Sequence, residues 1–155
     1  MGYSEAEFAG DRISEKSTSV TAIFLGQSLV TWASKKLNSL ALSTAEVEYI
    51  SAKACCAHIL WVKQHLCDLR LETGCVEIMC DNTSTISISK VLILYAWTKH
   101  IDIRHHFLRD SCEKRKIKLC FIPTKKQLVE IFIKPLVRES FEKSRMDLGI
   151  LRLPN

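Results

Sequence analysis

Four acidic residues, far apart in the sequence, carry the chemistry that this chain could perform. Glu5 lies near the N-terminus, Glu48 lies inside a long apolar run, Asp81 follows a short apolar strand, and Glu130 comes late in the chain. A buried carboxylate such as that of Glu48 costs several kcal/mol unless it is paired or bound to a cation. Carboxylates that meet need counter-charge, and Mg²⁺, which prefers oxygen ligands, supplies it. Two such ions can clamp the attacking and leaving oxygens of a phosphoryl displacement.

Each of these acids also has a purely structural alternative. Glu5 could be an exposed strand residue, Asp81 could cap the helix that follows it, and Glu130 could be a surface charge. Glu46, close to Glu48, has the capping-box spacing from Ser43. The residues alone leave these alternatives open.

The stretch Ser43–Leu66 is the element that must position Glu48. It predicts a long helix that is apolar over most of its surface, and such a helix is normally buried between other layers. The predicted strands are Gly2–Phe8, Ala22–Leu25, Leu29–Ser34, Val76–Cys80 and Lys118–Ile122. Further helices are expected at 82–90, His100–Lys116, Gln127–Ile133 and Ser140–Leu148.

This order of elements favours an α/β protein of the α+β kind, with a mixed sheet and helices packed on its faces. The strand after the long helix can pair parallel to an earlier strand through a right-handed crossover. Ligands of such sheets bind at the strand ends. Glu5, Glu48 and Asp81 could therefore converge there, with Glu130 as a fourth member.

Composition narrows the class of protein. The chain has 155 residues, of which 47% are hydrophobic and 25% charged, as expected for one folded domain. Its N-terminus lacks the pattern of a signal peptide, and its seven cysteines form no disulfide framework. We therefore expect an intracellular protein, cytoplasmic or nuclear and not secreted. The net charge of +5 comes partly from lysine and arginine clusters, which form either a solvated face or a surface for phosphates.

Several motifs carry a family resemblance. They are GYSEAEFAGDR (2–12), KSTS (16–19), WASKK (32–36), ALSTAEVEYISA (41–52), CDNTSTISISK (80–90), TKHIDIRHHFLRD (98–110) and IPTKKQLVEIFIKPL (122–136). In this order they resemble the RNase H domain of the Pol polyprotein of copia-type plant retrotransposons. The resemblance implies an RNase H-like fold, in which three antiparallel strands precede alternating helices and strands. We expect it to span residues 1–136, with a C-terminal helix and tail at 137–155. The implied activity is an endonuclease that hydrolyses the RNA strand of RNA/DNA hybrids with two Mg²⁺ ions.

The resemblance also implies which residues would be catalytic and bind metal, namely Glu5, Glu48, Asp81 and Glu130. Glu48 and Asp81 match the family in residue type, whereas the family usually has Asp at the positions of Glu5 and Glu130. The longer side chain displaces each carboxylate, and a displacement of about 1 Å can cost on the order of 10²-fold in rate. We therefore expect weak or absent activity and more tolerance for Mn²⁺ than for Mg²⁺. The alternative is a catalytically inactive module that binds nucleic acid or protein.

Partner contacts are expected at two places. A nucleic-acid backbone would be contacted by Lys99, Arg104 and Arg109, since such contacts supply most non-specific affinity. The apolar run Val91–Trp97 would bind a protein partner if it is exposed. Trp32, Trp61 and Trp97 are expected in the core and not at a base-stacking surface.

Overall fold

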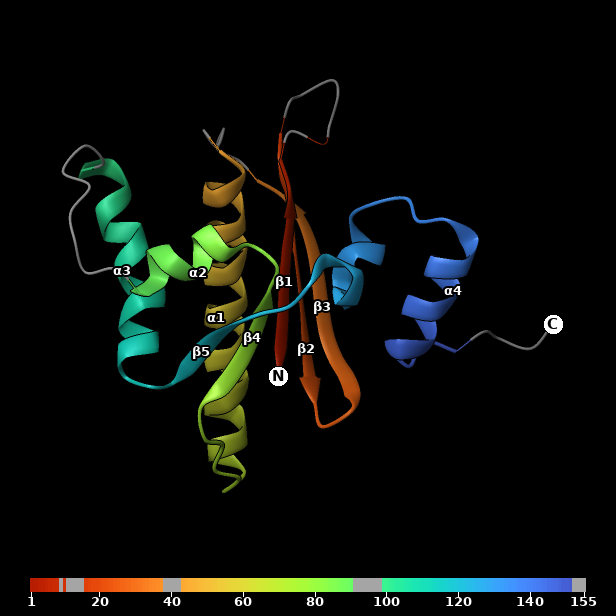
Figure 1. The fold of residues 1–155 in the computed structure, drawn as a ribbon. Coiled ribbons are helices and arrows are strands. Elements are labelled where there is room, and N and C mark those ends of the chain that lie inside the picture. Colours follow the sequence, from red (N-terminus) through yellow and green to blue (C-terminus); the bar gives the residue numbers. More distant parts are fainter. Residues whose placement is uncertain (9, 11–15, 38–42, 91–98, 152–155) are drawn as a thin grey trace.

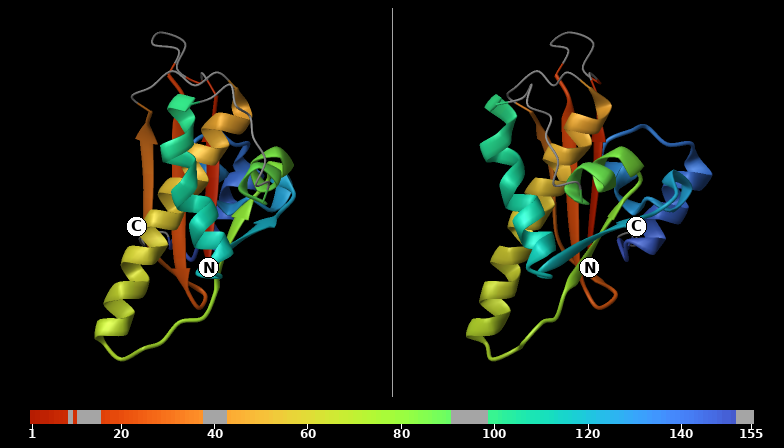
Figure 2. Two further views of the ribbon diagram at one scale, coloured as in Figure 1. Left: turned by 90° about the vertical axis from the view of Figure 1, so that its left-hand side faces the viewer. Right: turned by 60° about the vertical axis from the view of Figure 1, so that its left-hand side comes forward.

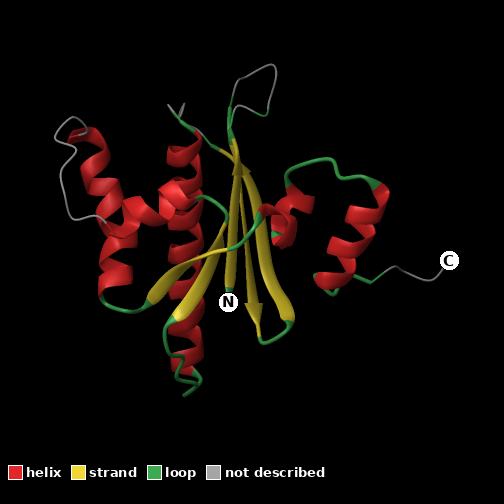
Figure 3. Ribbon diagram, in the orientation of Figure 1, coloured by secondary structure: helices red, strands yellow, loops and turns green. Residues whose placement is uncertain are grey.

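The computed structural model describes residues 1–8, 10, 16–37, 43–90 and 99–151. Its strands are β1 (Gly2–Glu7), β2 (Thr18–Leu25), β3 (Ser28–Lys36), β4 (Val76–Cys80) and β5 (Ile117–Phe121). Its helices are α1 (Thr44–Asp68), α2 (Thr83–Lys90), α3 (Lys99–Glu113), the 3₁₀ helices η1 (Thr124–Lys126) and η2 (Leu128–Phe132), and α4 (Arg138–Asp147). Figure 1 shows the fold and Figure 3 its helices and strands.

The strands form one mixed five-stranded sheet in the order β3-β2-β1-β4-β5. β1, β2 and β3 are antiparallel, whereas β4 runs parallel to both β1 and β5. The β2–β3 hairpin turns at Gly26, whose φ of +62° favours glycine. The predicted mixed sheet, with three antiparallel strands first, is confirmed.

Helices cover both faces of the sheet. α1 packs across β1, β2 and β4, with α2 and α3 beside it, whereas η2 packs on β1 and β2 from the opposite side and contacts α4 (Figures 1 and 2). Each face has its own apolar cluster. One is built on α1 around Tyr49, Ile59 and Ile78, and the other joins Tyr3 and Phe24 to η2. The predicted domain boundary after residue 136 stays a prediction.

Helix α1 begins where the sequence predicts. Ser43 is its N-cap, and the Ser43 side chain accepts a hydrogen bond from the Glu46 backbone N–H at 3.2 Å. Its buried residues extend from Val47 to Ile59 and include Glu48.

α3 ends three residues before its predicted end, because Arg115 adopts a left-handed conformation with φ +52°.

The prediction that the tryptophans lie in the core is wrong for two of them. Trp32 is 52% exposed on edge strand β3, where it stacks on Phe132 with ring centroids 4.4 Å apart. Trp61 is 59% exposed, because α1 has no buried residue after Ile59. Trp97 lies outside the described residues.

Across the described ranges, none of the helices has both the length and the apolar character needed to cross a bilayer.

Candidate metal centre

Strand pairing explains why Glu5 and Asp81 meet. Within the described strands, β1 and β4 pair at Gly2 with Ile78 and at Tyr3 with Met79. Continuing this parallel register by two residues places Glu5 opposite Asp81, just beyond the paired segment. α1 packs over both strands and brings Glu48 to the same place.

The three carboxylates of Glu5, Glu48 and Asp81 form a compact cluster, which we call the acidic cluster. One oxygen from each lies within 4.8 Å of the other two. Glu5 is only 2% exposed and Glu48 only 3%, whereas Asp81 is partly exposed. The cluster is therefore closed on the protein side and open at Asp81.

Hydrogen bonding within the described part of the chain leaves two oxygens of the acidic cluster unused. Glu48 Oε1 accepts a hydrogen bond from the Ala6 backbone N–H at 3.1 Å. Glu48 Oε2 and Glu5 Oε2 are buried and have no hydrogen-bond partner among the described residues. Buried polar atoms are normally satisfied, and carboxylate oxygens are the ligands that Mg²⁺ and Mn²⁺ favour. The donor set therefore fits a hard divalent cation.

Burial also changes the protonation of the acidic cluster. Burial, followed by the nearby charge of Glu5, raises the pKa of Glu48 to about 8, although the Ala6 N–H opposes the rise. Burial raises the pKa of Glu5 as well, and Asp81 adds to the rise while a hydrogen bond from Lys134 opposes it. Without a cation, Glu5 and Glu48 therefore retain protons to higher pH than exposed glutamates do.

Glu130 joins the acidic cluster only indirectly. Among the described residues, the carboxylates that lie within 4.8 Å of one another are those of Glu5, Glu48 and Asp81, without Glu130. Lys134 lies between them, with its Nζ 3.0 Å from Glu5 Oε1 and 3.6 Å from Glu130 Oε1. Partial burial lowers the pKa of Lys134, but its hydrogen bond to Glu5 and the charges of Glu5 and Glu130 outweigh this and raise it. The sequence analysis missed Lys134, although its i,i+4 spacing from Glu130 was a signal.

Three further residues that the sequence analysis missed fix the backbone and side chains of the site. Thr124 Oγ1 donates a hydrogen bond to Asp81 Oδ2 at 2.8 Å. Gln127 Nε2 donates to the Ser4 carbonyl at 2.9 Å, and Ser51 Oγ donates to the Glu5 carbonyl at 2.8 Å. Nothing in the spacing of these residues indicated their roles.

The predicted nucleic-acid contacts stay predictions. Arg109 is described, and its guanidinium lies 2.7 Å from His106 Nδ1 and 4.0 Å from Glu113 Oε1. Lys99 and Arg104 lie in α3, but their side chains are outside the described set. The predicted protein-binding run Val91–Trp97 also lies outside the described residues.

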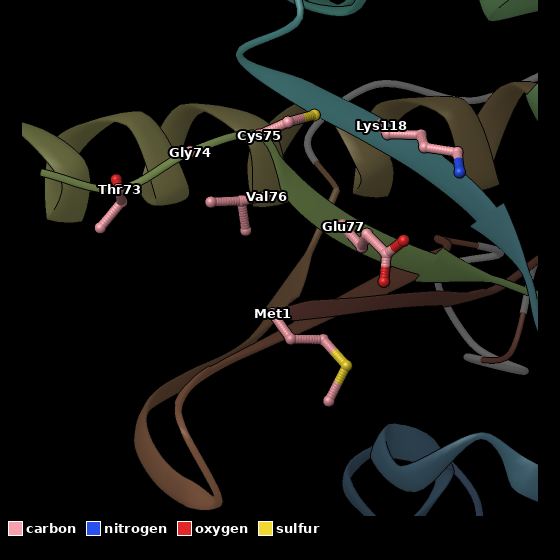
Figure 4. Close-up of a pocket in the computed structure, with 7 residues that line it drawn as sticks. All are labelled: Met1, Thr73, Gly74, Cys75, Val76, Glu77 and Lys118. Carbon is pink, nitrogen blue, oxygen red and sulfur yellow. The ribbon is translucent and has the colours of Figure 1, made fainter.

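A pocket of about 450 Å³ lies elsewhere on the molecule (Figure 4). Its lining includes Cys75, Val76 and Glu77, at the start of β4. Asp81 follows the other end of that strand, so three residues lie between Glu77 of the pocket and Asp81 of the acidic cluster, roughly 13 Å along the strand at about 3.3 Å per residue. We assign no role to this pocket in the chemistry of the carboxylates.

The sequence is similar to known retrotransposon proteins. It is 32% identical over 149 residues to the retrovirus-related Pol polyprotein from transposon TNT 1-94 of Nicotiana tabacum. The match covers 96% of this chain and 11% of the polyprotein, so the chain spans about a tenth of the length of its relative. No protein-family model matches the chain.

Two solved structures share the fold. The LC11 RNase H1, solved in complex with an RNA/DNA hybrid, aligns with a TM-score of 0.55 and 12% identity over 81% of this chain and 86% of its own. The N-terminal RNase H domain of rv2228c from Mycobacterium tuberculosis was solved as a fusion with maltose-binding protein. It aligns with a TM-score of 0.56 and 8% identity, over 94% of this chain and 96% of the solved chain. The chain is thus homologous to part of the Pol polyproteins of copia-type plant retrotransposons, and it has an RNase H fold.

Proposed function

We propose that this chain is a ribonuclease H-type hydrolase, which cleaves the RNA strand of RNA/DNA hybrids with divalent cations. The observation that carries the proposal is the acidic cluster, in which three carboxylates lie within 4.8 Å and two buried oxygens lack partners among the described residues. Homology to retrotransposon polyproteins and the RNase H fold support it. Mg²⁺ is the proposed ion, with Mn²⁺ as a substitute.

Each residue of the site has a distinct proposed role. Glu5 and Glu48 hold the buried side of the cation, and Asp81 holds the side that faces solvent, where a phosphate can approach. Glu130 supplies a further carboxylate next to Glu5. A divalent cation bound there would neutralise charge on the phosphate and lower the pKa of a water. Thr124 keeps Asp81 oriented through its hydrogen bond.

The substrate would bind beside the exposed edge of the cluster. A hybrid is recognised through its shape, its phosphates and its 2′-hydroxyls, and Lys99, Arg104 and Arg109 are the proposed contacts to the backbone. We place the activity inside the cell, where such hybrids form.

A binding module is the second candidate, and one observation favours it. Glu5 contacts Lys134 at 3.0 Å and Glu130 lies 3.6 Å from the same ammonium, so an internal cation already engages two of the four acids. A protein with this arrangement could retain the fold and the hybrid-binding surface while cleaving slowly or not at all.

A labelled RNA/DNA hybrid separates the two functions. The wild-type chain is incubated with Mg²⁺ and separately with Mn²⁺, alongside Asp81→Asn and the exposed control Glu72→Gln. If the chain is an enzyme, we expect cleavage that is faster with Mn²⁺ than with Mg²⁺. This cleavage should be lost in Asp81→Asn and unchanged in Glu72→Gln. The double substitution Glu5→Asp and Glu130→Asp should then raise the rate with Mg²⁺. Binding that weakens steeply with salt, without cleavage under either ion, would instead establish the module.

A further inference from the structure

The space between Glu5 and Glu130 already contains a positive charge. Lys134 Nζ lies 3.0 Å from Glu5 Oε1 and 3.6 Å from Glu130 Oε1. The Lys134 side chain is 32% exposed and that of Glu130 24%, whereas Glu5 is 2% exposed. The ammonium therefore bridges a buried and a half-buried carboxylate, and it lies next to the acidic cluster.

The backbone holds Lys134 in this place. η2 ends at Phe132, and the backbone N–H groups of Ile133 and Lys134 both donate to the Glu130 carbonyl, at 3.0 and 2.9 Å. The turn therefore fixes Lys134 and Glu130 relative to each other before their side chains meet. A lysine ammonium is a compact point charge with three donors, so one group can serve both carboxylates.

The acidic cluster and this bridge share only Glu5. Glu5 Oε1 contacts Lys134, whereas Glu5 Oε2 is buried without a partner among the described residues, as is Glu48 Oε2. One side of the site thus has two buried oxygens without a hydrogen-bond partner among the described residues. The other side has oxygens that a protein cation already satisfies.

We propose that Lys134 is a built-in substitute for a second metal ion, which limits the chain to one divalent cation at Glu5, Glu48 and Asp81. The identity of that first site rests on the proposed function. Lys134 acts here as a positioning residue, because it holds Glu5 and Glu130 and has no part in the chemistry itself. Two divalent ions roughly 3.5–4 Å apart are typical of sites that clamp both oxygens of a displaced phosphate. An ammonium tethered at one of those positions excludes the second ion by occupying its ligands and by repelling its charge.

The test counts bound Mn²⁺ and does not depend on activity. The full chain is titrated with Mn²⁺, free ion is measured by electron paramagnetic resonance, and binding is followed by calorimetry. We expect about one ion per wild-type chain and about two per Lys134→Met chain, because removing the ammonium frees the oxygens of a second site. Lys134→Arg, which retains the charge, and Lys143→Met, an exposed lysine of α4, should both bind about one, as the wild type does.

A double variant locates the added ion. Lys134→Met combined with Glu130→Gln should return to about one ion, because the second site loses a carboxylate ligand. Circular dichroism confirms that each variant is folded, and Lys134→Arg keeps the test informative should Lys134→Met unfold. Binding of a second ion by the Lys134→Arg chain would overturn the inference.

The remaining outcomes distinguish this inference from the proposed function. Two ions in the wild type, or one ion in Lys134→Met, would overturn the role of Lys134 and leave the proposed function standing. No Mn²⁺ binding in any variant would overturn both, because the acidic cluster would then not be a metal site.

Discussion

Replacing Glu48 by Gln should stabilise the metal-free protein at alkaline pH. The pKa of Glu48 is raised to about 8 in the folded chain, against 4.5 for an unperturbed glutamate. Between these values the folded state holds a proton that the unfolded state has released. The stabilising contribution of neutral Glu48 is therefore complete below pH 4.5 and is lost as the pH rises through about 8. A neutral Gln can still accept the hydrogen bond from the Ala6 N–H, but it never acquires the buried charge.

The size of the effect follows from the shift. One pKa unit corresponds to about 1.36 kcal/mol, so a rise from 4.5 to about 8 amounts to about 5 kcal/mol of folding stability. That is comparable to the whole stability of many domains, roughly 5–15 kcal/mol. In a chain of this size it corresponds to about 10–20 °C in Tm.

The assay is urea unfolding of the wild type and of Glu48→Gln between pH 5 and pH 9, with a chelator in the buffer. The difference in free energy of unfolding should be small at pH 5 and grow with pH to favour the Gln variant. Glu72→Gln, an exposed matched control, should show a difference that does not vary with pH. In a parallel series without chelator, added Mn²⁺ should restore the stability of the wild type at pH 9 and leave that of Glu48→Gln unchanged, because the ion favours the ionised carboxylate. A difference between wild type and Glu48→Gln that is independent of pH would refute the reasoning.

Three other substitutions test how the site is positioned. Ser43→Ala removes the N-cap of α1 and should cost about 1 kcal/mol, measured as a fall in Tm of about 2–4 °C; an unchanged Tm would mean that the cap contributes nothing. Gly2→Ala places a Cβ 2.7 Å from Ile59 Cδ1 and 2.9 Å from Cys55 Sγ, so it should destabilise the chain by about 1–3 kcal/mol. Adding Ile59→Val should recover part of this loss in urea unfolding, and no recovery would argue against the clash. Thr124→Val removes the hydrogen bond to Asp81 and should weaken Mn²⁺ binding several-fold in calorimetry while Tm changes little; equal affinity would show that Asp81 needs no such support.

The fold was predictable from the sequence because its determinants are local. The Gly26 turn and the Ser43 cap each specify an element through neighbouring residues. The meeting of Glu5 and Asp81 was predictable at a coarser level, since Glu5 lies in β1, Asp81 directly follows β4, and these two strands are parallel neighbours. The family resemblance supplied the assignment of all four acids, which the residues alone left open.

What could not be predicted depends on contacts between distant segments. Lys134 meets Glu5 across 129 positions of sequence, and Thr124 meets Asp81 across 43. Whether Trp32 was buried depended on β3 being an edge strand and not on its composition. Such facts follow from the topology of the whole chain.

The length of the Glu5 side chain and the position of Lys134 are best understood together. Shortening Glu5 to the Asp that the family usually has would withdraw its carboxylate by roughly one carbon–carbon bond, about 1.5 Å. The 3.0 Å contact with Lys134 would then exceed the distance of a hydrogen bond. The longer acid is thus what allows one lysine to bridge Glu5 and Glu130, so the two departures from the family pattern and the internal cation form a single arrangement. Catalytic weakness, if measured, would follow from this arrangement as a whole and not from a misplaced carboxylate alone.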